Sequence, residues 1–190
     1  MEVRPLGIVD CFVTSRPVWG DDRGFFREWH KLADLPASWQ GFVAAQANLS
    51  SSATNVVRGL HYSLALEGQA KIVTCVGGAL VDVICDIRVG SPTYGVVELV
   101  PLAADRGDSV LLPAGVAHGF CVPDGPATLA YLLSSPYRPD VELEIDPFDE
   151  DLAVSWPIPG SALLSPKDAA APSLAARAAA GELPIFTARS

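Results

Sequence analysis

Basic residues are scarce in this chain of 190 residues, which contains 13 Lys and Arg against 22 Asp and Glu. The resulting formal net charge of -9 argues against nucleic acid as a partner. No apolar run approaches the roughly 20 residues needed to cross a bilayer. The first segment, Met1–Val13, lacks the basic start and long apolar stretch of a secretory signal. We therefore expect a globular protein of the cytoplasm that has no membrane partner.

Several chemical motifs are also missing. The cysteines are widely separated and form no C-x-x-C pair, which disfavours a zinc site, and a disulfide framework is not expected in a cytoplasmic chain of this size. They are Cys11, Cys75, Cys85 and Cys121. The chain has no G-x-S-x-G, no phosphate-binding P-loop and no dinucleotide-binding glycine fingerprint. These absences leave acid–base chemistry as the main catalytic possibility.

Glycine and proline are plentiful, with 16 of each, as a turn-rich β protein requires. Apolar, β-branched stretches recur between residues 7 and 133, separated by turn signals such as Gly77-Gly78, which predicts a hairpin. This spacing predicts a sandwich, jelly roll or barrel. Helices are expected only at Lys31–Trp39 and Asp168–Ala180. No linker or repeat is visible, so residues 1–190 are expected to form a single domain.

Two of the three histidines lie in predicted strands, and histidine is the usual proton shuttle near neutral pH. Strict alternation would send His61 and Arg58 to opposite faces of a strand, but Gly59 between them permits a bulge that turns both toward one cavity. His118 interrupts another apolar strand. A metal site is not favoured, because Ser63 replaces the second histidine of an H-x-H pair and no Glu completes a ligand set.

Lys71 places a cation in the middle of an apolar strand. It either faces solvent or points into the fold, where it needs an anionic partner, and Asp82, Asp86 or a bound ligand could supply one. The acidic stretch at residues 140–151 is interpreted as a solvated face without a chemical role. The residues alone thus indicate a β-barrel with an embedded His, Lys and Arg set, suited to proton transfer on an anionic ligand.

At these positions the chain resembles the dTDP-4-dehydrorhamnose 3,5-epimerase family over nearly its whole length. The resemblance is carried by ordered blocks, which include Asp22–Glu28, Gln46–Ser50, Val57–Tyr62, Gln69–Val73, Asp82–Arg88, Pro113–Phe120 and Leu164–Ala169. It implies a double-stranded β-helix, or jelly roll, with a cupin-like barrel, a short C-terminal helix and a homodimeric assembly. It also implies an isomerase that acts on a dTDP-4-keto-6-deoxyhexose, with no metal or organic cofactor.

The resemblance further assigns site residues. It implies that His61 is the general base, Asp168 the carboxylate paired with it, Tyr131 the acid on the opposite side of the sugar, and Lys71 the cation beside the ketone oxygen. The implied substrate-binding residues are Arg23, Phe26, Glu28, Gln46, Asn48, Arg58, His118 and Tyr137.

The reaction that this family resemblance favours is 3-epimerisation of dTDP-4-dehydro-6-deoxyglucose in an antibiotic deoxysugar pathway. The family often has Lys after the acid Tyr, whereas Leu132 stands here, a change that could alter which carbon is inverted. The alternatives are a 3,5-epimerase, a 5-epimerase or a 3,4-ketoisomerase on the same scaffold. A metal-dependent cupin oxygenase and a non-catalytic sugar-binding barrel are further alternatives from other functional classes.

Overall fold

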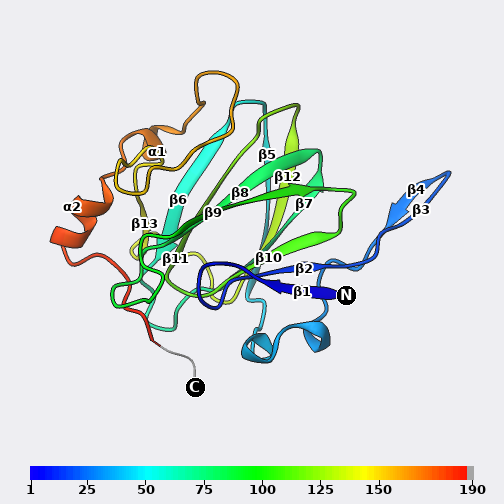
Figure 1. Ribbon diagram of the computed structural model, residues 1–190, viewed down its shortest axis with the longest axis horizontal. Coiled ribbons are helices and arrows are strands. Elements are labelled where there is room, and N and C mark those ends of the chain that lie inside the picture. The colour runs from blue at the N-terminus through cyan, green and yellow to red at the C-terminus, as the bar shows by residue number, and fades with distance from the viewer. Residues whose placement is uncertain (188–190) are drawn as a thin grey trace.

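The computed structural model describes residues 1–187, and antiparallel strands dominate it (Figure 1). The larger sheet contains, in spatial order, β1 (Glu2–Pro5), β2 (Phe12–Ser15), β10 (Asp108–Leu112), β7 (Lys71–Gly77), β12 (Ala127–Leu133) and β5 (Gln46–Ser52). The smaller sheet contains β13 (Glu142–Glu144), β6 (Val57–Ser63), β11 (Val116–Cys121), β8 (Ala79–Asp86) and β9 (Val97–Ala103). The predicted all-β jelly roll is confirmed, with two facing sheets that do not close into a continuous barrel.

The main hydrophobic core lies between these two sheets. Val73 and Leu129 of the larger sheet pack in one cluster with Leu80, Ile84 and Leu102 of the smaller sheet, and each is at most 2% exposed. Burying such side chains contributes roughly 1.5–3 kcal/mol apiece relative to exposure. The core therefore holds the two sheets in a fixed relation, and the site residues extend from strands that it anchors.

The Gly77-Gly78 turn is tight, as the sequence predicts, but it does not form a hairpin. β7 pairs with β10 and β12, whereas β8 pairs with β11 and β9, so the turn carries the chain from one sheet to the other. Gly78 has a positive φ of 67°, and a Cβ there would lie 2.2 Å from the carbonyl oxygen of Pro126. The pairing prediction was wrong because turn chemistry specifies a local reversal and not the partner strand.

Helical structure is shorter than the sequence suggests. Lys31–Trp39 forms two 3₁₀ turns, η1 (Leu32–Asp34) and η2 (Ala37–Trp39), with Pro36 at the start of the second. The predicted C-terminal helix is split into α1 (Pro166–Ala169) and α2 (Leu174–Ala179), because Pro172 cannot continue a helix. Within the described residues, no helix has the length and apolar character to cross a membrane.

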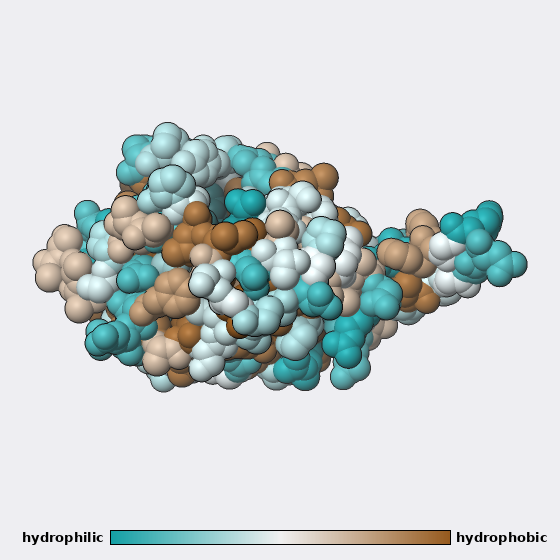
Figure 2. Space-filling view, turned by 90° about the horizontal axis from the view of Figure 1, so that it is seen from above, coloured by the Kyte–Doolittle hydropathy of each residue, from teal (hydrophilic) through white to brown (hydrophobic). Residues whose placement is uncertain are grey.

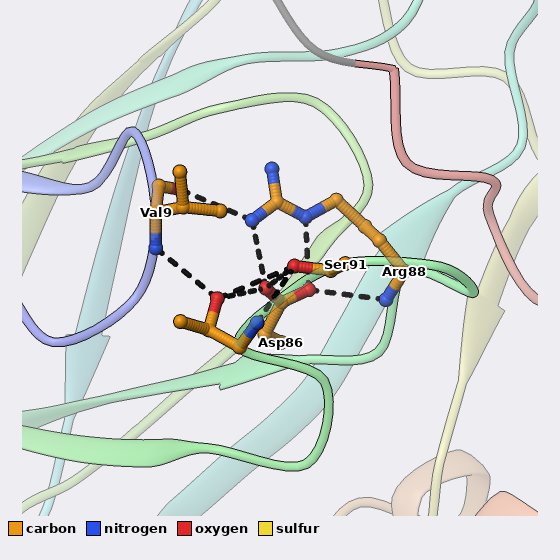
Figure 3. A network of polar contacts seen from close by, with 5 residues as sticks. Val9, Asp86, Arg88 and Ser91 are labelled. Atoms are coloured by element: carbon orange, nitrogen blue, oxygen red, sulfur yellow. Dashed lines mark hydrogen bonds and ion pairs between the residues drawn. The ribbon is translucent and has the colours of Figure 1, made fainter.

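A buried polar network fixes the end of β8 to the N-terminal loop (Figure 3). The Asp86 carboxylate accepts hydrogen bonds from the Arg88 guanidinium at 2.8 Å and from the hydroxyls of Ser91 and Thr93 at 2.6 Å each. Arg88 and Thr93 also bind the backbone of Val9. Burial alone would raise the pKa of Asp86, but these donors outweigh it and lower the pKa. Asp86 is therefore a structural anion and not the partner of Lys71.

A two-stranded arm projects from the body of the protein (Figures 1 and 2). It consists of β3 (Trp19–Asp21) and β4 (Gly24–Phe26), which pair only with each other. Trp19 and Phe26 stack with ring centroids 5.9 Å apart, yet their exposed fractions are 52% and 66%. The arm thus presents aromatic surface that this chain does not bury.

Candidate active site

A cavity of about 470 Å³ opens between the ends of the two sheets and α1. This volume lies within the range of small-molecule sites, roughly 300–1,000 Å³. Its lining consists of Gln46, Asn48, Leu49, Arg58, His61, Gln69, Lys71, Tyr131, Leu133, Tyr137, Glu142, Leu143, Ser165, Lys167 and Asp168. Eight of the sequence-predicted site residues are among them: His61, Asp168, Tyr131, Lys71, Gln46, Asn48, Arg58 and Tyr137.

A histidine–aspartate pair forms one wall of the cavity. His61 Nε2 lies 2.7 Å from Asp168 Oδ1, although the two residues are 107 positions apart in the chain. The Ser165 hydroxyl caps α1 by accepting the Asp168 N–H, which fixes the backbone of the carboxylate. Burial would raise the pKa of Asp168, but the hydrogen bond and charge of His61 lower it below 3.8. The carboxylate therefore stays ionised and holds the proton on Nε2, leaving Nδ1 as a base.

A bulge in β6 turns Arg58 and His61 toward the same cavity. The pairing with β11 passes from His118–His61 to Phe120–Arg58, so β6 contains one extra residue. Gly59 at the bulge has φ 122°, and a Cβ there would lie 2.6 Å from the Gly119 Cα. The bulge predicted from the sequence is confirmed, and only glycine fits at its centre.

Lys71 points into the fold and is only 7% exposed. Burial lowers the pKa of its ammonium group, while the charges of Glu142 and Asp82 raise it. Its Nζ lies 3.4 Å from the carbonyl oxygen of His61. The alternative of a solvent-facing lysine is excluded, and of its two expected partners only Asp82 contributes to its charge balance.

Tyr131 lies on β12 of the larger sheet and lines the cavity together with His61 of the smaller sheet. Burial raises the pKa of its phenol above 10, while a hydrogen bond with Asn48 opposes that rise. The phenol is therefore protonated near neutral pH and can act as an acid. Gln46 orders this wall, because it donates to Asn48 Oδ1 at 2.9 Å and accepts the Tyr137 N–H at 2.9 Å.

Four sequence-predicted binding residues lie outside the cavity lining. His118 is 8% exposed and its Nε2 lies 2.6 Å from Asp82 Oδ1, so it is part of the interior behind the cavity. Arg23 and Phe26 lie on the projecting arm, and Glu28 follows β4. All three are exposed, and Arg23 pairs with Asp21 on the same arm.

Sequence reasoning missed other residues of the cavity. Gln69 and Lys167 lie inside the blocks of family resemblance but received no role, and Glu142 was assigned to a solvated acidic face. That interpretation of the acidic stretch was wrong in part. Asp149 is 5% exposed and accepts the Leu174 N–H at 2.7 Å, which caps α2. Alternation along β13 is a signal that could have suggested inward acids, but a strand of three residues is too short to read reliably.

Within residues 1–187, no cluster of three or more His, Cys, Asp or Glu side chains is arranged to hold a metal ion. The functional groups of the cavity are instead a base with its carboxylate, a buried ammonium, a phenol and a guanidinium. Such a set can remove a proton from carbon, stabilise the negative charge that develops and return a proton from another direction.

Comparison with known proteins gives consistent results. The family model described as dTDP-4-dehydrorhamnose 3,5-epimerase matches residues 5–176. A curated relative from Streptomyces sp, named dTDP-4-dehydro-6-deoxyglucose 3-epimerase, is 39% identical over 187 residues, which are 98% of this chain and 95% of the relative.

Solved structures agree with this match. NovW, a 4-keto-6-deoxy sugar epimerase from the novobiocin biosynthetic gene cluster of Streptomyces spheroides, is 44% identical with a TM-score of 0.92, covering 98% of this chain and 94% of NovW. ChmJ, a 3'-monoepimerase from Streptomyces bikiniensis in complex with dTDP-quinovose, is 39% identical with a TM-score of 0.88, covering 96% of this chain and 92% of ChmJ.

Proposed function

Because this chain belongs to the dTDP-4-dehydrorhamnose 3,5-epimerase family, we propose that it is a dTDP-4-dehydro-6-deoxyglucose 3-epimerase of antibiotic deoxysugar biosynthesis. It is an isomerase that inverts a carbon next to the C4 ketone of its sugar. The observation that carries this proposal is the His61–Asp168 pair, at 2.7 Å, in a cavity that Lys71 and Tyr131 also line.

In the first step, His61 Nδ1 removes the proton from C3 of the sugar. The electron pair of the broken C–H bond moves into an enolate whose negative oxygen is the former C4 ketone. Asp168 stabilises the imidazolium that forms, and the Lys71 ammonium stabilises the enolate oxygen. Both interactions strengthen as charge develops, so they lower the barrier rather than only binding the substrate.

In the second step, Tyr131 donates its phenolic proton to C3 from the other face and the C4 ketone reforms; proton exchange with water then returns the phenolate and the imidazolium to their starting states. Inversion requires an acid opposite the base, and β12 and β6 belong to opposing sheets. Arg58 lines the cavity and donates a hydrogen bond to the Ser52 hydroxyl at 3.0 Å. Its guanidinium can bind the negatively charged diphosphate of the substrate. The nucleotide, remote from the reacting carbon, positions the sugar.

The choice of C3 alone is supported by the names of the relative and of ChmJ, both 3-epimerases. Leu132, which stands after Tyr131 where the family often has Lys, packs among the hydrophobic residues around Trp39. It does not line the cavity. Leu133, by contrast, does line it. The second candidate is 3,5-epimerisation, which the description of the matching family favours.

Product analysis distinguishes these reactions. We expect the purified protein, incubated with dTDP-4-dehydro-6-deoxyglucose, to give the C3-inverted ketone, identified by ¹H NMR coupling constants of the ring. Inversion at both C3 and C5 would establish the second candidate instead. A product with its ketone at C3 would identify a 3,4-ketoisomerase, and an unchanged sugar would contradict the proposal altogether.

We also propose a homodimer in which the arm of one copy completes the cavity of the other. Arg23 and Phe26 are among the residues implied to bind the substrate, yet they lie on an arm that projects from the body of the chain and do not line its cavity. The exposed Trp19 and Phe26 rings supply apolar area that a second copy can bury.

Mixing two inactive variants tests this assembly. An Arg23→Ala/Phe26→Ala double variant and a His61→Ala variant are each expected to be impaired, because one lacks a working arm and the other a base. Random exchange of subunits rebuilds one intact composite site in each heterodimer, so activity should recover to about a quarter of the wild-type value. Activity that stays at the sum of the separate variants would contradict a shared site.

The location that we propose is the cytoplasm. All four cysteines are free and buried in the structure. Reduced thiols of this kind are typical of a reducing compartment.

A further inference from the structure

The ammonium group of Lys71, the buried cation of the cavity, is balanced by carboxylates that form no direct ion pair with it. Among the described residues, no carboxylate forms an ion pair with the Lys71 ammonium, and its Nζ has one weak protein acceptor, the His61 carbonyl oxygen at 3.4 Å. An ammonium group has three N–H donors. Two of them therefore remain for a ligand oxygen, although the side chain is almost completely buried.

Such burial would remove the charge of an isolated lysine. Two carboxylates oppose this effect and raise the pKa of Lys71, namely Glu142 of β13 and Asp82 of β8. Asp82 is fully buried and bound to His118, so it lies behind the cavity, whereas Glu142 lines it. Glu142 is thus the counter-charge on the ligand's side of the lysine.

Gln69 holds Glu142 in place. Its Nε2 donates to Glu142 Oε1 at 2.7 Å and lies 3.5 Å from the Ser135 carbonyl oxygen, and the residue as a whole is 4% exposed. A glutamate freed from this bond could pair directly with Lys71, which would occupy the donors that the substrate needs. The amide therefore maintains a separation in which the carboxylate stabilises the cation without blocking it.

Building on the function proposed above, we propose that Glu142 is a positioning residue, anchored by Gln69, that keeps Lys71 charged and its N–H donors free for the ketone oxygen of the substrate. The other ionisable groups that line the cavity with this lysine are Arg58 and His61 of β6, Tyr131 of β12, Tyr137, and Lys167 and Asp168 of α1, and His118 of β11 binds Asp82 behind it. Of these, Tyr131 also senses Glu142, whose charge raises the pKa of the phenol.

The test measures deuterium exchange at C3 of the substrate against pH in a Tyr131→Phe background. This background removes the phenol, whose ionisation would otherwise also end activity at high pH, while exchange by His61 on one face remains possible. Glu142→Gln should lower kcat for exchange and move the alkaline limb to lower pH by about one unit, since an opposite charge nearby favours the ammonium form. Glu142→Asp keeps the negative charge, so its alkaline limb should lie close to that of the Tyr131→Phe background protein.

Gln69→Leu should also lower kcat, but it should shift the alkaline limb in the opposite direction. It frees Glu142 to pair with Lys71, so kcat and the affinity for the ketone fall while the alkaline limb moves to higher pH. Glu150→Gln, which removes the same charge from an exposed position, is the matched control and should leave the profile unchanged.

The possible results separate this inference from the function on which it rests. Opposite shifts in Glu142→Gln and Gln69→Leu support it, because a general loss of folding would not move the two limbs apart. A Glu142→Gln profile equal to that of Glu150→Gln, or shifts of both variants in one direction, overturns it. Absence of exchange in the background protein and in the wild type alike overturns the proposed epimerase function itself.

Discussion

Replacement of His61 by alanine is expected to lower the rate of proton removal by about 10²–10⁴-fold, the usual contribution of a positioned general base. The reason is geometric, since His61 is the one imidazole among the described residues that line the cavity: Asp168 occupies its Nε2 at 2.7 Å and leaves Nδ1 free. Steady-state kinetics with dTDP-4-dehydro-6-deoxyglucose would measure the effect, which should fall on kcat because the base acts in the transition state.

Two controls make the His61 result specific. His30→Ala removes a half-buried histidine that contacts Phe42 outside the cavity, so it should leave kcat near the wild-type value. The space left in His61→Ala should also admit free imidazole, and added imidazole should recover part of the activity. A wild-type kcat in His61→Ala would remove this residue from the mechanism.

Replacement of Lys71 by methionine is expected to lower kcat by about 10²–10³-fold, by analogy with the loss of one donor to a developing oxyanion. Methionine has a similar length and no charge, so it removes the electrostatic interaction while filling the buried space. Because isolated buried charges are costly, the variant should fold at least as stably as the parent protein. Comparison of kcat with the thermal midpoint of unfolding would separate the two effects.

Lys31→Met is the matched control for Lys71, because it removes a lysine charge at an exposed position outside the cavity. It should change neither kcat nor KM. A Lys71→Met protein that raised KM alone would show that the ammonium binds the ketone and the enolate equally well, which would contradict its proposed role.

The sequence predicted the fold well where local patterns decide it. Apolar, β-branched stretches bounded by turns identify the strands, because the alternation of buried and exposed side chains follows directly from strand geometry. Which strands pair with one another was harder to predict from the sequence. Gly77-Gly78 specifies a reversal, but only the packing of the whole core sends β7 and β8 to different sheets.

The site was predictable to the extent that its residues lie on regular strands. The bulge at Gly59 could be expected from the glycine between two polar residues, and the structure brings Arg58 and His61 to one cavity. The pairing of His61 with Asp168 came from family resemblance, since a contact across 107 positions has no local signal. Glu142 was missed because its inward orientation depends on a short strand beside β6.

Two features depend on more than local sequence. His118 is a predicted binding residue, and its Nε2 lies 2.6 Å from the buried carboxylate of Asp82 on the adjacent strand, a contact that has no local signal in the sequence. Arg23, Phe26 and Glu28 lie on the arm or just beyond it, and sequence alone does not indicate that these residues project from the body that contains the cavity.

Incubation of the wild-type protein with dTDP-4-dehydro-6-deoxyglucose in D₂O, followed by NMR of the recovered sugar, tests the removal of a carbon-bound proton most directly. We expect deuterium at C3, accumulating in step with inversion, and the loss of this label in His61→Ala. A sugar that inverts at C3 while retaining its original hydrogen there, or one that takes up no deuterium at C3, would contradict it.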